Sequence, residues 1–418
     1  MSNQAYSYSS LSRHLYPDDF YKDQKLGVDG AYRAAIIQES IGLAKTAAVC
    51  GNVKTHPIKN KVCFINDSMS EKLVLRRCAE ILRKSVGRLK SRHQIIDELV
   101  PFLKEGSQYE IYRLDIKSFF EKCSIDDLIK KINENKLVLS QTKNIVSSVV
   151  RNIDSGIPRG VEISSILSEI YLEDFDDKVR MNSSVLYYSR YVDDIIIVSV
   201  TNEDQSAFFS EIESYLPDGL EFNSDSKKDI IKVPVRSGGR QLQGSWEDKL
   251  IAKFDFLGYS LSVIDFVKGK PKEGSREYRK VEIDISDKKL KKLKTLIARS
   301  IYNYSKNNDF DLLSDRLEFL STNRNMQMKR SKSYVLTGIF YNYARVNKFD
   351  ADSSLVKLDG YLKGVLLSKN GRLSKSLNGI GKIRKNNLLT VSFVNGFKYK
   401  IFKKYGLDRL GDITRIWL

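Results

Sequence analysis

The spacing of apolar residues predicts two helices and a strand in the first part of the chain. The segment AYRAAIIQESIGLAKTAAV is apolar-periodic, and the basic, Pro-containing KTHPIKNKVCFI after it reads as strand and loop. A helix is expected to begin after Ser68, because Ser68 and Glu71 have the spacing of a capping box. Apolar residues recur at helical spacing behind this box: Leu73, Val74, Cys78, Ile81 and Leu82. Another helical stretch, KSVGRLKSRHQIIDELVPFL, opens with many Lys and Arg residues.

From residue 109 the period becomes two, which predicts a strand with one core face and one polar face. Leu114 and Ile116 point to one side of this strand, and Arg113 and Asp115 point to the other. A helical stripe follows a turn at 155–158: Ile163, Ile166, Leu167, Ile170 and Tyr171. Two β-rich runs, VLYYSRY and IIIVSV, flank the pair Asp193 and Asp194. This pair is therefore predicted at the tip of a hairpin.

The rest of the chain reads as strands, then helices, then a mixed basic segment. The apolar run FDFLGYSLSVI, the charged loop GKPKEGSREYRK and VEIDIS precede a Lys-rich helix from about Asp287 to Tyr304, and helical pattern continues to about Leu366. Beyond it, Lys and Arg alternate with aromatic residues, which suits contact with phosphates and bases. The alternative is that this segment packs on the preceding helices through an apolar face: Leu388, Leu389, Val391, Phe393 and Ile401, with Trp417 anchoring the end.

Composition indicates a globular protein with a polyanionic partner. The 418 residues are 41% hydrophobic, and 70 Lys and Arg against 52 Asp and Glu give a formal net charge of +18. A merely soluble basic surface is the alternative. The four cysteines, Cys50, Cys63, Cys78 and Cys123, lack the spacing of a zinc site or a disulfide scaffold, which favours a reducing cytoplasm. With no signal-like N-terminus and no apolar run near the ~20 residues of a membrane span, we expect neither secretion nor membrane insertion.

Three carboxylates have the arrangement that phosphoryl transfer requires. Transfer to a 3′-hydroxyl uses two divalent ions about 3.5–4 Å apart, and hard ions such as Mg²⁺ bind carboxylate oxygens. Asp115 ends a strand, and Asp193 with Asp194 lies at a hairpin tip, so neighbouring strands could bring them to one edge. A lone Asp-Asp pair is usually a solvated turn, so the argument depends on the ordered set of motifs around it.

These motifs resemble those of reverse transcriptases. Residues 191–194, YVDD, resemble the YxDD signature, and residues 114–120, LDIKSFF, resemble the first carboxylate motif. Residues 156–164, GIPRGVEIS, are similar to the segment that supports the template and incoming nucleotide. Residues 220–223, LEFN, with Lys227 or Lys228, resemble the motif that places a lysine near the pyrophosphate. Residues 256–259, FLGY, resemble the primer-grip hairpin, and residues 92–96, RHQII, resemble the fingers motif that contacts triphosphate.

The resemblance implies a role for each residue of these motifs. Asp115 and Asp193 would bind two Mg²⁺ ions, with Asp194 assisting. Phe120 would lie under the sugar and exclude a 2′-hydroxyl, although Phe119 and Phe120 could instead both be core. Further contacts are implied for the nucleotide, by Arg92, Gly160 and Lys227 or Lys228, and for primer and template, by Tyr191, Arg159, Phe256, Leu257 and Gly258. For Arg92 the alternative is a solvated helix residue, and the choice between the two lysines stays open.

The implied fold is that of a right-hand polymerase of mixed α/β (α+β) class. Its expected parts are fingers at 1–108, an RRM-like palm at 109–265, a helical thumb at 266–367 and a basic C-terminal RNA-binding region at 368–418. The implied partners are an RNA template, dNTPs and the cDNA product.

Departures from the commonest motif narrow the resemblance. Group II intron and retron enzymes usually read PQGxxxSP in the middle motif, whereas this chain has Arg159 in place of Gln and Ser165 in place of Pro. This version, with DRLEFL at 315–320 and TGIFYNY at 337–343, resembles bacterial defence-associated, abortive-infection-like enzymes, most of all the compact type 2 defence system. The resemblance implies cDNA synthesis on a dedicated noncoding RNA in antiphage defence in the bacterial cytoplasm. The alternatives are a retron or group II intron-type enzyme and a catalytically silent RNA-binding scaffold.

Overall fold

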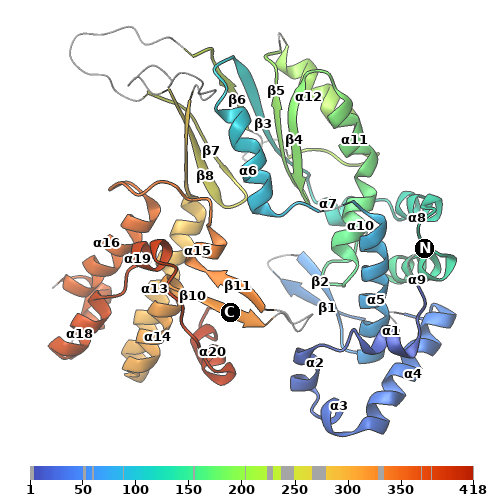
Figure 1. Ribbon diagram of the computed structural model, residues 1–418, viewed down its shortest axis with the longest axis horizontal. Helices are drawn as coiled ribbons and strands as arrows, with labels where there is room; N and C mark the ends of the chain where they lie inside the picture. Colours follow the sequence, from blue (N-terminus) through green and yellow to red (C-terminus); the bar gives the residue numbers. More distant parts are fainter. Residues whose placement is uncertain are drawn as a thin grey trace. The chain divides into compact units, whose positions relative to one another are not determined.

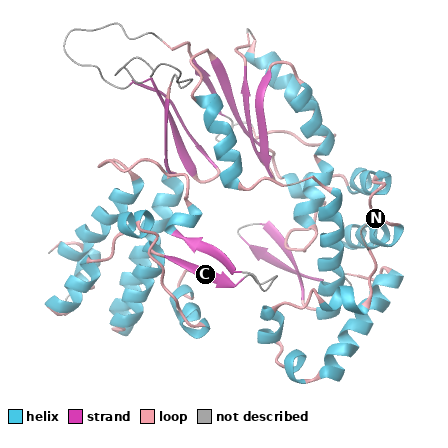
Figure 2. Ribbon diagram, viewed as in Figure 1, coloured by secondary structure: helices cyan, strands magenta, loops and turns pink. Residues whose placement is uncertain are grey.

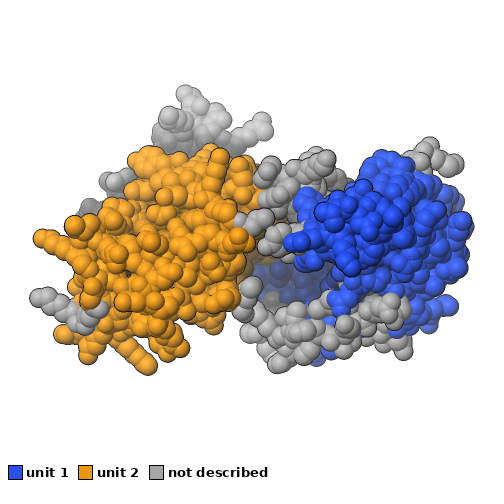
Figure 3. Space-filling model, turned by 90° about the horizontal axis from the view of Figure 1, so that it is seen from below, with its two compact units in different colours: residues 1–91, 108–234, 329–332 blue, residues 92–107, 235–328, 333–418 orange. Residues whose placement is uncertain are grey.

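The chain folds into two compact units of mixed helix and sheet. The computed structural model describes residues 4–49, 53–58, 61–87, 89–153, 156–202, 204–223, 229–236, 249–265, 279–327, 334–368, 370–377 and 379–417. Unit 1 comprises residues 1–91, 108–234 and 329–332, and unit 2 comprises 92–107, 235–328 and 333–418 (Figure 3). The boundaries of these two units differ from the expected boundaries of fingers, palm and thumb. Residues 92–107 of the expected fingers and the end of the expected palm belong to unit 2 with the C-terminal half.

The N-terminal part of unit 1 is helical, with one hairpin (Figures 1 and 2). The long helix α5 begins after Ser68, whose side chain accepts a hydrogen bond from the N–H of Glu71 at 3.3 Å, as the capping spacing predicts. The basic segment before it pairs as an antiparallel hairpin, so the expected strand is present. The elements are α1 (Tyr8–Ser12), α2 (Pro17–Lys22), α3 (Lys25–Val28), α4 (Gly30–Thr46), β1 (Val53–Ile58), β2 (Lys61–Asn66) and α5 (Met69–Ser85).

An antiparallel sheet in the order β4-β5-β3-β6 forms the centre of unit 1. Its strands are β3 (Tyr109–Asp115), β4 (Val185–Tyr191), β5 (Asp194–Ser199) and β6 (Asp229–Val233). Asp115, on the expected polar face of β3, is only 8% exposed, and Ile111 on the same face is 0% exposed, so this face is covered rather than solvated. Helices cover the opposite, apolar face: the ring of Phe208 lies 4.9 Å from that of Tyr112, and the ring of Phe175 lies 6.2 Å from that of Tyr188.

The helices of this part of unit 1 are α7 (Phe119–Lys122), α8 (Ile125–Glu134), α9 (Ser140–Ile153), α10 (Ser164–Tyr171), α11 (Glu173–Met181) and α12 (Gln205–Ser214). Helix α10 confirms the predicted stripe, because Ile166, Leu167 and Ile170 are all buried. One hydrophobic core joins α4, α5 and the N-terminal hairpin to the sheet and its helices. The central sheet is therefore held in place by the packing of the whole unit.

Unit 2 combines a three-stranded meander with helices. The strands β7 (Lys249–Phe256), β8 (Tyr259–Asp265) and β9 (Lys280–Ile285) pair in sequence order. Helix α6 (Arg92–Leu103) belongs to this unit, where Arg279 donates to the carbonyl of Glu105 just beyond the helix at 2.9 Å. Helices α13 (Asp287–Asn307) and α14 (Phe310–Ser321) follow, and α13 confirms the predicted Lys-rich helix. The expected continuation of helical pattern is wrong after α14, because β10 (Asn323–Gln327) and β11 (Tyr334–Gly338) pair as a hairpin there.

The C-terminal segment packs on the helices that precede it, as the alternative interpretation expected. It contains α15 (Ile339–Asn342), α16 (Ser354–Leu367), α17 (Arg372–Lys375), α18 (Lys382–Leu389), α19 (Phe393–Lys398) and α20 (Leu407–Thr414). Asp359 on α16 accepts hydrogen bonds from the Ser392 hydroxyl and the Phe393 N–H, both at 2.6 Å. Leu388 and Phe393 are fully buried, although Ile401 is 39% exposed and does not belong to that apolar face.

Candidate active site

The three aspartates lie at one end of the central sheet. Strand β3 ends at Asp115, whose Cα partner across the antiparallel pair is Asp194, the first residue of β5. The N–H of Ile116 donates to the carbonyl of Asp193 at 3.3 Å. The hairpin tip predicted from the sequence is present, since Tyr191 ends β4 and pairs with Asp194. The register of two adjacent strands therefore gathers residues that are far apart in the sequence.

The hairpin turn adopts an unfavourable backbone conformation that a buried arginine stabilises. Val192 has a φ of 62°, and this left-handed region is rare for a β-branched residue. Arg190, with a side chain only 2% exposed, donates from Nη1 to the carbonyl of Val192 at 2.9 Å. A donor aimed at this carbonyl holds the turn that carries Asp193.

Two buried carboxylates hold Arg190 in place. Its Nη2 lies 2.8 Å from Glu169 and 2.7 Å from Asp176. Burial opposes its charge, but the hydrogen bond and charge of Asp176, then the charge of Glu169, outweigh burial and raise the pKa of Arg190. Burial also raises the pKa of Glu169, although Arg190 partly opposes this. Sequence reasoning did not single out this group. The available signal was an arginine inside a β-rich run, which requires a buried partner.

Asp115 is fixed by the segment that resembles the lysine-bearing motif. Asn223 donates to Asp115 twice, from its side chain to the carboxylate and from its N–H to the carbonyl at 2.8 Å. Glu221 next to it binds Lys122 at 2.7 Å and Lys117 at 2.9 Å. The hydrogen bonds from Lys122 and Lys117, with their charges, lower the pKa of Glu221 to about 2. The expected pyrophosphate lysines, Lys227 and Lys228, lie outside the described residues.

Several residues expected at the nucleotide, primer and template lie in unit 1. Phe119 is 1% exposed and belongs to the core, whereas Phe120 is only partly buried, so the two phenylalanines differ. The Arg159 guanidinium carbon lies 4.1 Å from the centroid of the Phe120 ring. Gly160 has a φ of 92°, and a Cβ there would lie 2.6 Å from the carbonyl oxygen of Phe64. Tyr191 is 39% exposed at the end of β4.

The other predicted residues gather at a turn in unit 2. Phe256 is buried at the end of β7, and Leu257 and Gly258 form the turn with φ values of 49° and 89°. Arg92, expected in the fingers, lies here, and its Nη1 donates to the Leu257 carbonyl at 3.4 Å.

Positive charge concentrates at the same turn. A Cβ on Gly258 would lie 3.4 Å from Cε of Lys289 and 3.8 Å from Nη1 of Arg92. Burial and the charges of Lys292, Arg92 and Lys288 lower the pKa of Lys289. The turn that resembles a primer grip therefore has a cationic surround suited to phosphate.

The donor set at the sheet edge fits a hard divalent ion by its chemistry. Asp115 and Asp194 face each other across two strands, Asp193 adjoins them, and carboxylate oxygens are the ligands that Mg²⁺ prefers. Within the described ranges, no group of three acidic, histidine or cysteine side chains has the arrangement of a finished metal site. By the chemistry of their carboxylates, Asp115, Asp193 and Asp194 could hold such ions.

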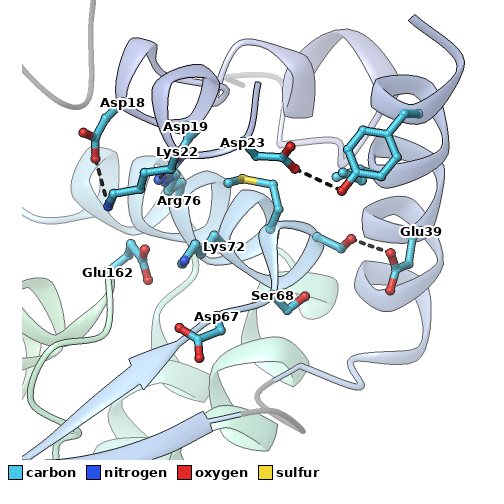
Figure 4. Close-up of a pocket in the computed structure, with 14 residues that line it drawn as sticks. Asp18, Asp19, Lys22, Asp23, Glu39, Asp67, Ser68, Lys72, Arg76 and Glu162 are labelled. Atoms are coloured by element: carbon cyan, nitrogen blue, oxygen red, sulfur yellow. Dashed lines mark hydrogen bonds and ion pairs between the residues drawn. The ribbon is translucent and has the colours of Figure 1, made fainter. Parts of the chain in front are cut away.

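A separate hollow in unit 1 does not include this edge. It has a volume of about 650 Å³ and is lined by residues of α2, α4 and α5 together with Glu162 (Figure 4). Several of its charges are already paired, Lys22 with Asp18 at 3.1 Å and Arg76 with Asp19 through both terminal guanidinium nitrogens. Its lining contains none of the three aspartates, so the hollow and the carboxylate edge are distinct places.

A known protein family matches the part of the chain that carries these motifs. Residues 62–260 match the family model described as Reverse transcriptase (RNA-dependent DNA polymerase). No curated protein matches the chain in sequence. Among solved structures, the chain is similar to one titled "Structure of apo telomerase from Candida Tropicalis truncated from C-terminal domain", with 15% identity and a TM-score of 0.34. That match covers 55% of this chain and 59% of the telomerase chain.

The matched residues include the carboxylate edge, the Phe120 segment and the turn at Leu257. The predicted mixed α/β fold of a right-hand polymerase is confirmed. In the part of the chain that the structure describes, no helix is both long and apolar enough to span a bilayer. Residues 62–260 therefore correspond to a reverse transcriptase domain, the family described as RNA-dependent DNA polymerase.

Proposed function

We propose that the chain is a bacterial antiphage-defence reverse transcriptase that copies a dedicated, structured noncoding RNA into cDNA, with Asp115, Asp193 and Asp194 binding two Mg²⁺ ions. The observation that carries this proposal is the register of β3 with β5, which sets Asp115 opposite Asp194 beside the Asp193 turn. When bound, the ions would activate the primer 3′-hydroxyl and neutralise charge on the triphosphate. The buried Arg190 and the side chain of Asn223 hold the carboxylates for this task.

The remaining motif residues have roles in binding the nucleotide and the nucleic acid. Phe120 lies under the deoxyribose and excludes a 2′-hydroxyl, and Gly160 lets the backbone approach the nucleotide. Tyr191 supports the primer end from β4. Arg92 binds phosphate at the Leu257 turn, with Lys289 beside it. The net charge of +18 favours the RNA partner.

Two alternatives are less well supported. A catalytically silent RNA-binding scaffold would not need three carboxylates at one sheet edge, where like charges repel. A retron or group II intron-type enzyme is disfavoured by Arg159 and Ser165 in the middle motif. Sequencing the genomic neighbourhood of the gene separates the defence enzyme from the intron-type enzyme, because a noncoding RNA gene beside the reading frame is expected for the defence enzyme.

The catalytic assignment is tested by replacing Asp193 and Asp194 with Ala. Extension of a primer on an RNA template should fall to background, because the ions lose their ligands, while the melting temperature stays within a few degrees of the wild type. A matched control is Asp126→Ala with Asp127→Ala, an adjacent pair of exposed aspartates in the first turn of α8. Extension by the Asp193 and Asp194 double variant at the level of this control would refute the assignment.

The template proposal has its own test. Nucleic acid that co-purifies with the enzyme from cells should contain one discrete RNA species together with cDNA complementary to part of it. A heterogeneous pool of cellular RNA without complementary cDNA would contradict a dedicated template while leaving polymerase activity untouched.

A further inference from the structure

We propose that Arg159 is a positioning residue that holds the Phe120 ring and so sets how strongly the enzyme rejects ribonucleotides. This inference rests on the proposed role of Phe120 at the sugar. It assigns to Arg159 a task within unit 1 that differs from the template contact implied by its motif.

The Phe120 ring is held on two sides. The Arg159 guanidinium carbon lies over its face, 4.1 Å from the centroid, well inside the ~6 Å within which a cation is attracted to an aromatic face. The ring of Phe119 meets it edge-on, with centroids 5.3 Å apart and planes at 73°. Phe119 is itself fully buried, so it provides an immobile support. Arg159 is therefore the partner through which the exposed side of the ring is fixed.

Arg159 is itself anchored by a fork of two charge-assisted bonds. Its Nε lies 2.8 Å from one carboxylate oxygen of Glu121, and its Nη2 lies 3.2 Å from the other. A planar guanidinium bound in this way has a fixed orientation, which a lysine or a glutamine cannot reproduce. Glu121 directly follows Phe120, so the arginine spans the ring and returns to the same short helix, α7.

Backbone hydrogen bonds also hold the segments that carry Phe120 and Arg159. The N–H of Ile157 donates to the Phe120 carbonyl at 2.8 Å, and the N–H of Phe64 donates to the Arg159 carbonyl at 2.7 Å. Gly156 has a φ of 71°, and a Cβ there would overlap the Phe120 carbonyl oxygen. The turn that carries Arg159 thus lies against the backbone of Phe120, and the side-chain contact closes this arrangement.

Rigid placement matters because selection against a 2′-hydroxyl is steric. A ring that can rotate away admits the larger sugar, whereas a ring pinned between Arg159 and Phe119 does not. The guanidinium is also occupied by Glu121 and by the ring, which leaves it little capacity for a template phosphate. The sequence motif with glutamine at this position would lack both the cation over the ring and the charged fork.

The test is Arg159→Gln in the full-length chain, with incorporation of single dNTPs and rNTPs measured on one RNA template. The ratio of kcat/KM for dNTP over rNTP should fall roughly 3- to 30-fold, the range that corresponds to a cation–π contact of about 0.7–2 kcal/mol. The fall should come from a higher kcat/KM for rNTP. Phe120→Ala is the positive control, and Arg151→Gln, an exposed arginine on α9, is the matched control for losing one positive charge.

Two further variants keep the test decisive if Arg159→Gln folds poorly, which a melting curve reports. Glu121→Gln keeps the arginine but weakens its fork, and should lower the ratio by a smaller factor. Arg159→Lys keeps a cation without the fork, and should restore part of the ratio lost in Arg159→Gln.

Different failures have different signatures. If Arg159→Gln raises KM equally for dNTP and rNTP and leaves the ratio unchanged, Arg159 binds nucleotide or template directly and the positioning role is refuted. An unchanged ratio in Glu121→Gln and Arg159→Gln together, while Phe120→Ala lowers it, also refutes that role but leaves the sugar gate intact. Failure of the wild type to extend any primer would instead overturn the proposed function itself.

Discussion

Replacing Arg190 with Ala should destabilise unit 1 and abolish polymerisation for two separable reasons. The Arg190 side chain is 2% exposed and bonds to two acids that are themselves largely buried, Glu169 at 18% and Asp176 at 11%. Breaking a buried ion pair by removing one partner costs about 3–5 kcal/mol, because the remaining charge is left uncompensated. For a unit of this size we expect the melting temperature to fall by roughly 6–20 °C.

A compensated variant separates stability from activity. Combining Arg190→Met with Glu169→Gln and Asp176→Asn removes the buried charges together, and should recover most of the lost melting temperature. It does not restore the donor to the Val192 carbonyl, so the turn carrying Asp193 stays unsupported and primer extension should remain low. Arg180→Ala, whose side chain is 57% exposed, is the control for removing an arginine near Asp176.

The pH dependence of the Arg190→Ala variant gives an independent check. Burial already raises the pKa of Glu169, and loss of Arg190 removes the interactions that oppose this rise. A carboxyl group with a raised pKa in the folded state binds its proton more tightly when folded, so stability is lost as pH rises through that pKa. The variant should therefore melt closer to the wild type at about pH 5 than at about pH 7. A variant that melts like the wild type at both values, or retains full extension, would refute the reasoning.

Four further predictions concern particular contacts. Gly160→Ala should lower stability by more than ~1 kcal/mol beyond Gly219→Ala, because both have positive φ but only Gly160 has Phe64 against its missing Cβ; equal melting temperatures for the two would contradict this. Gly396→Ala should destabilise unit 2, because the added Cβ would overlap the Ser321 carbonyl, whereas Gly364→Ala, at a helical glycine in open space, should not. Truncation after residue 368 should lower both the melting temperature and RNA binding. A truncated chain that melts normally would disprove the packing role of the C-terminal segment. Arg92→Ala should make log affinity for primer–template fall less steeply with log salt by about 0.7–0.9, and an unchanged slope would exclude a phosphate contact.

Local sequence determined the elements that carry the carboxylates. Apolar residues at a period of two, ended by Asp115, were enough to predict β3, and the β-rich runs around Asp193 and Asp194 were enough to predict the hairpin. The cap at Ser68 was predictable for the same reason. In each case the signal lies within a few residues, where backbone geometry and hydrogen bonding are set by neighbours along the chain.

Tertiary structure decided how those elements meet. The sequence offered no means to pair Arg190 with Glu169 and Asp176, because an ion pair across 14 to 21 positions depends on how α10 and α11 pack against β4. The same holds for Asn323, whose strand β10 interrupts an otherwise helical pattern by pairing with β11. Long-range pairing competes with local propensity and wins where a buried backbone needs partners.

The candidate site shows the same division at the level of single side chains. The sequence motifs indicated that Phe120 and Arg159 both belong to the site. Only the folded chain brings the Arg159 guanidinium over the Phe120 ring and pairs it with Glu121. Likewise the sequence identified Arg92 as a positive charge in a motif, whereas its place beside the Leu257 turn in unit 2 follows from the packing of α6 with the β7–β9 meander. Sequence thus determined which chemical groups are present, and tertiary packing determined their contacts, because those contacts depend on distances of a few ångströms between segments that no local pattern encodes.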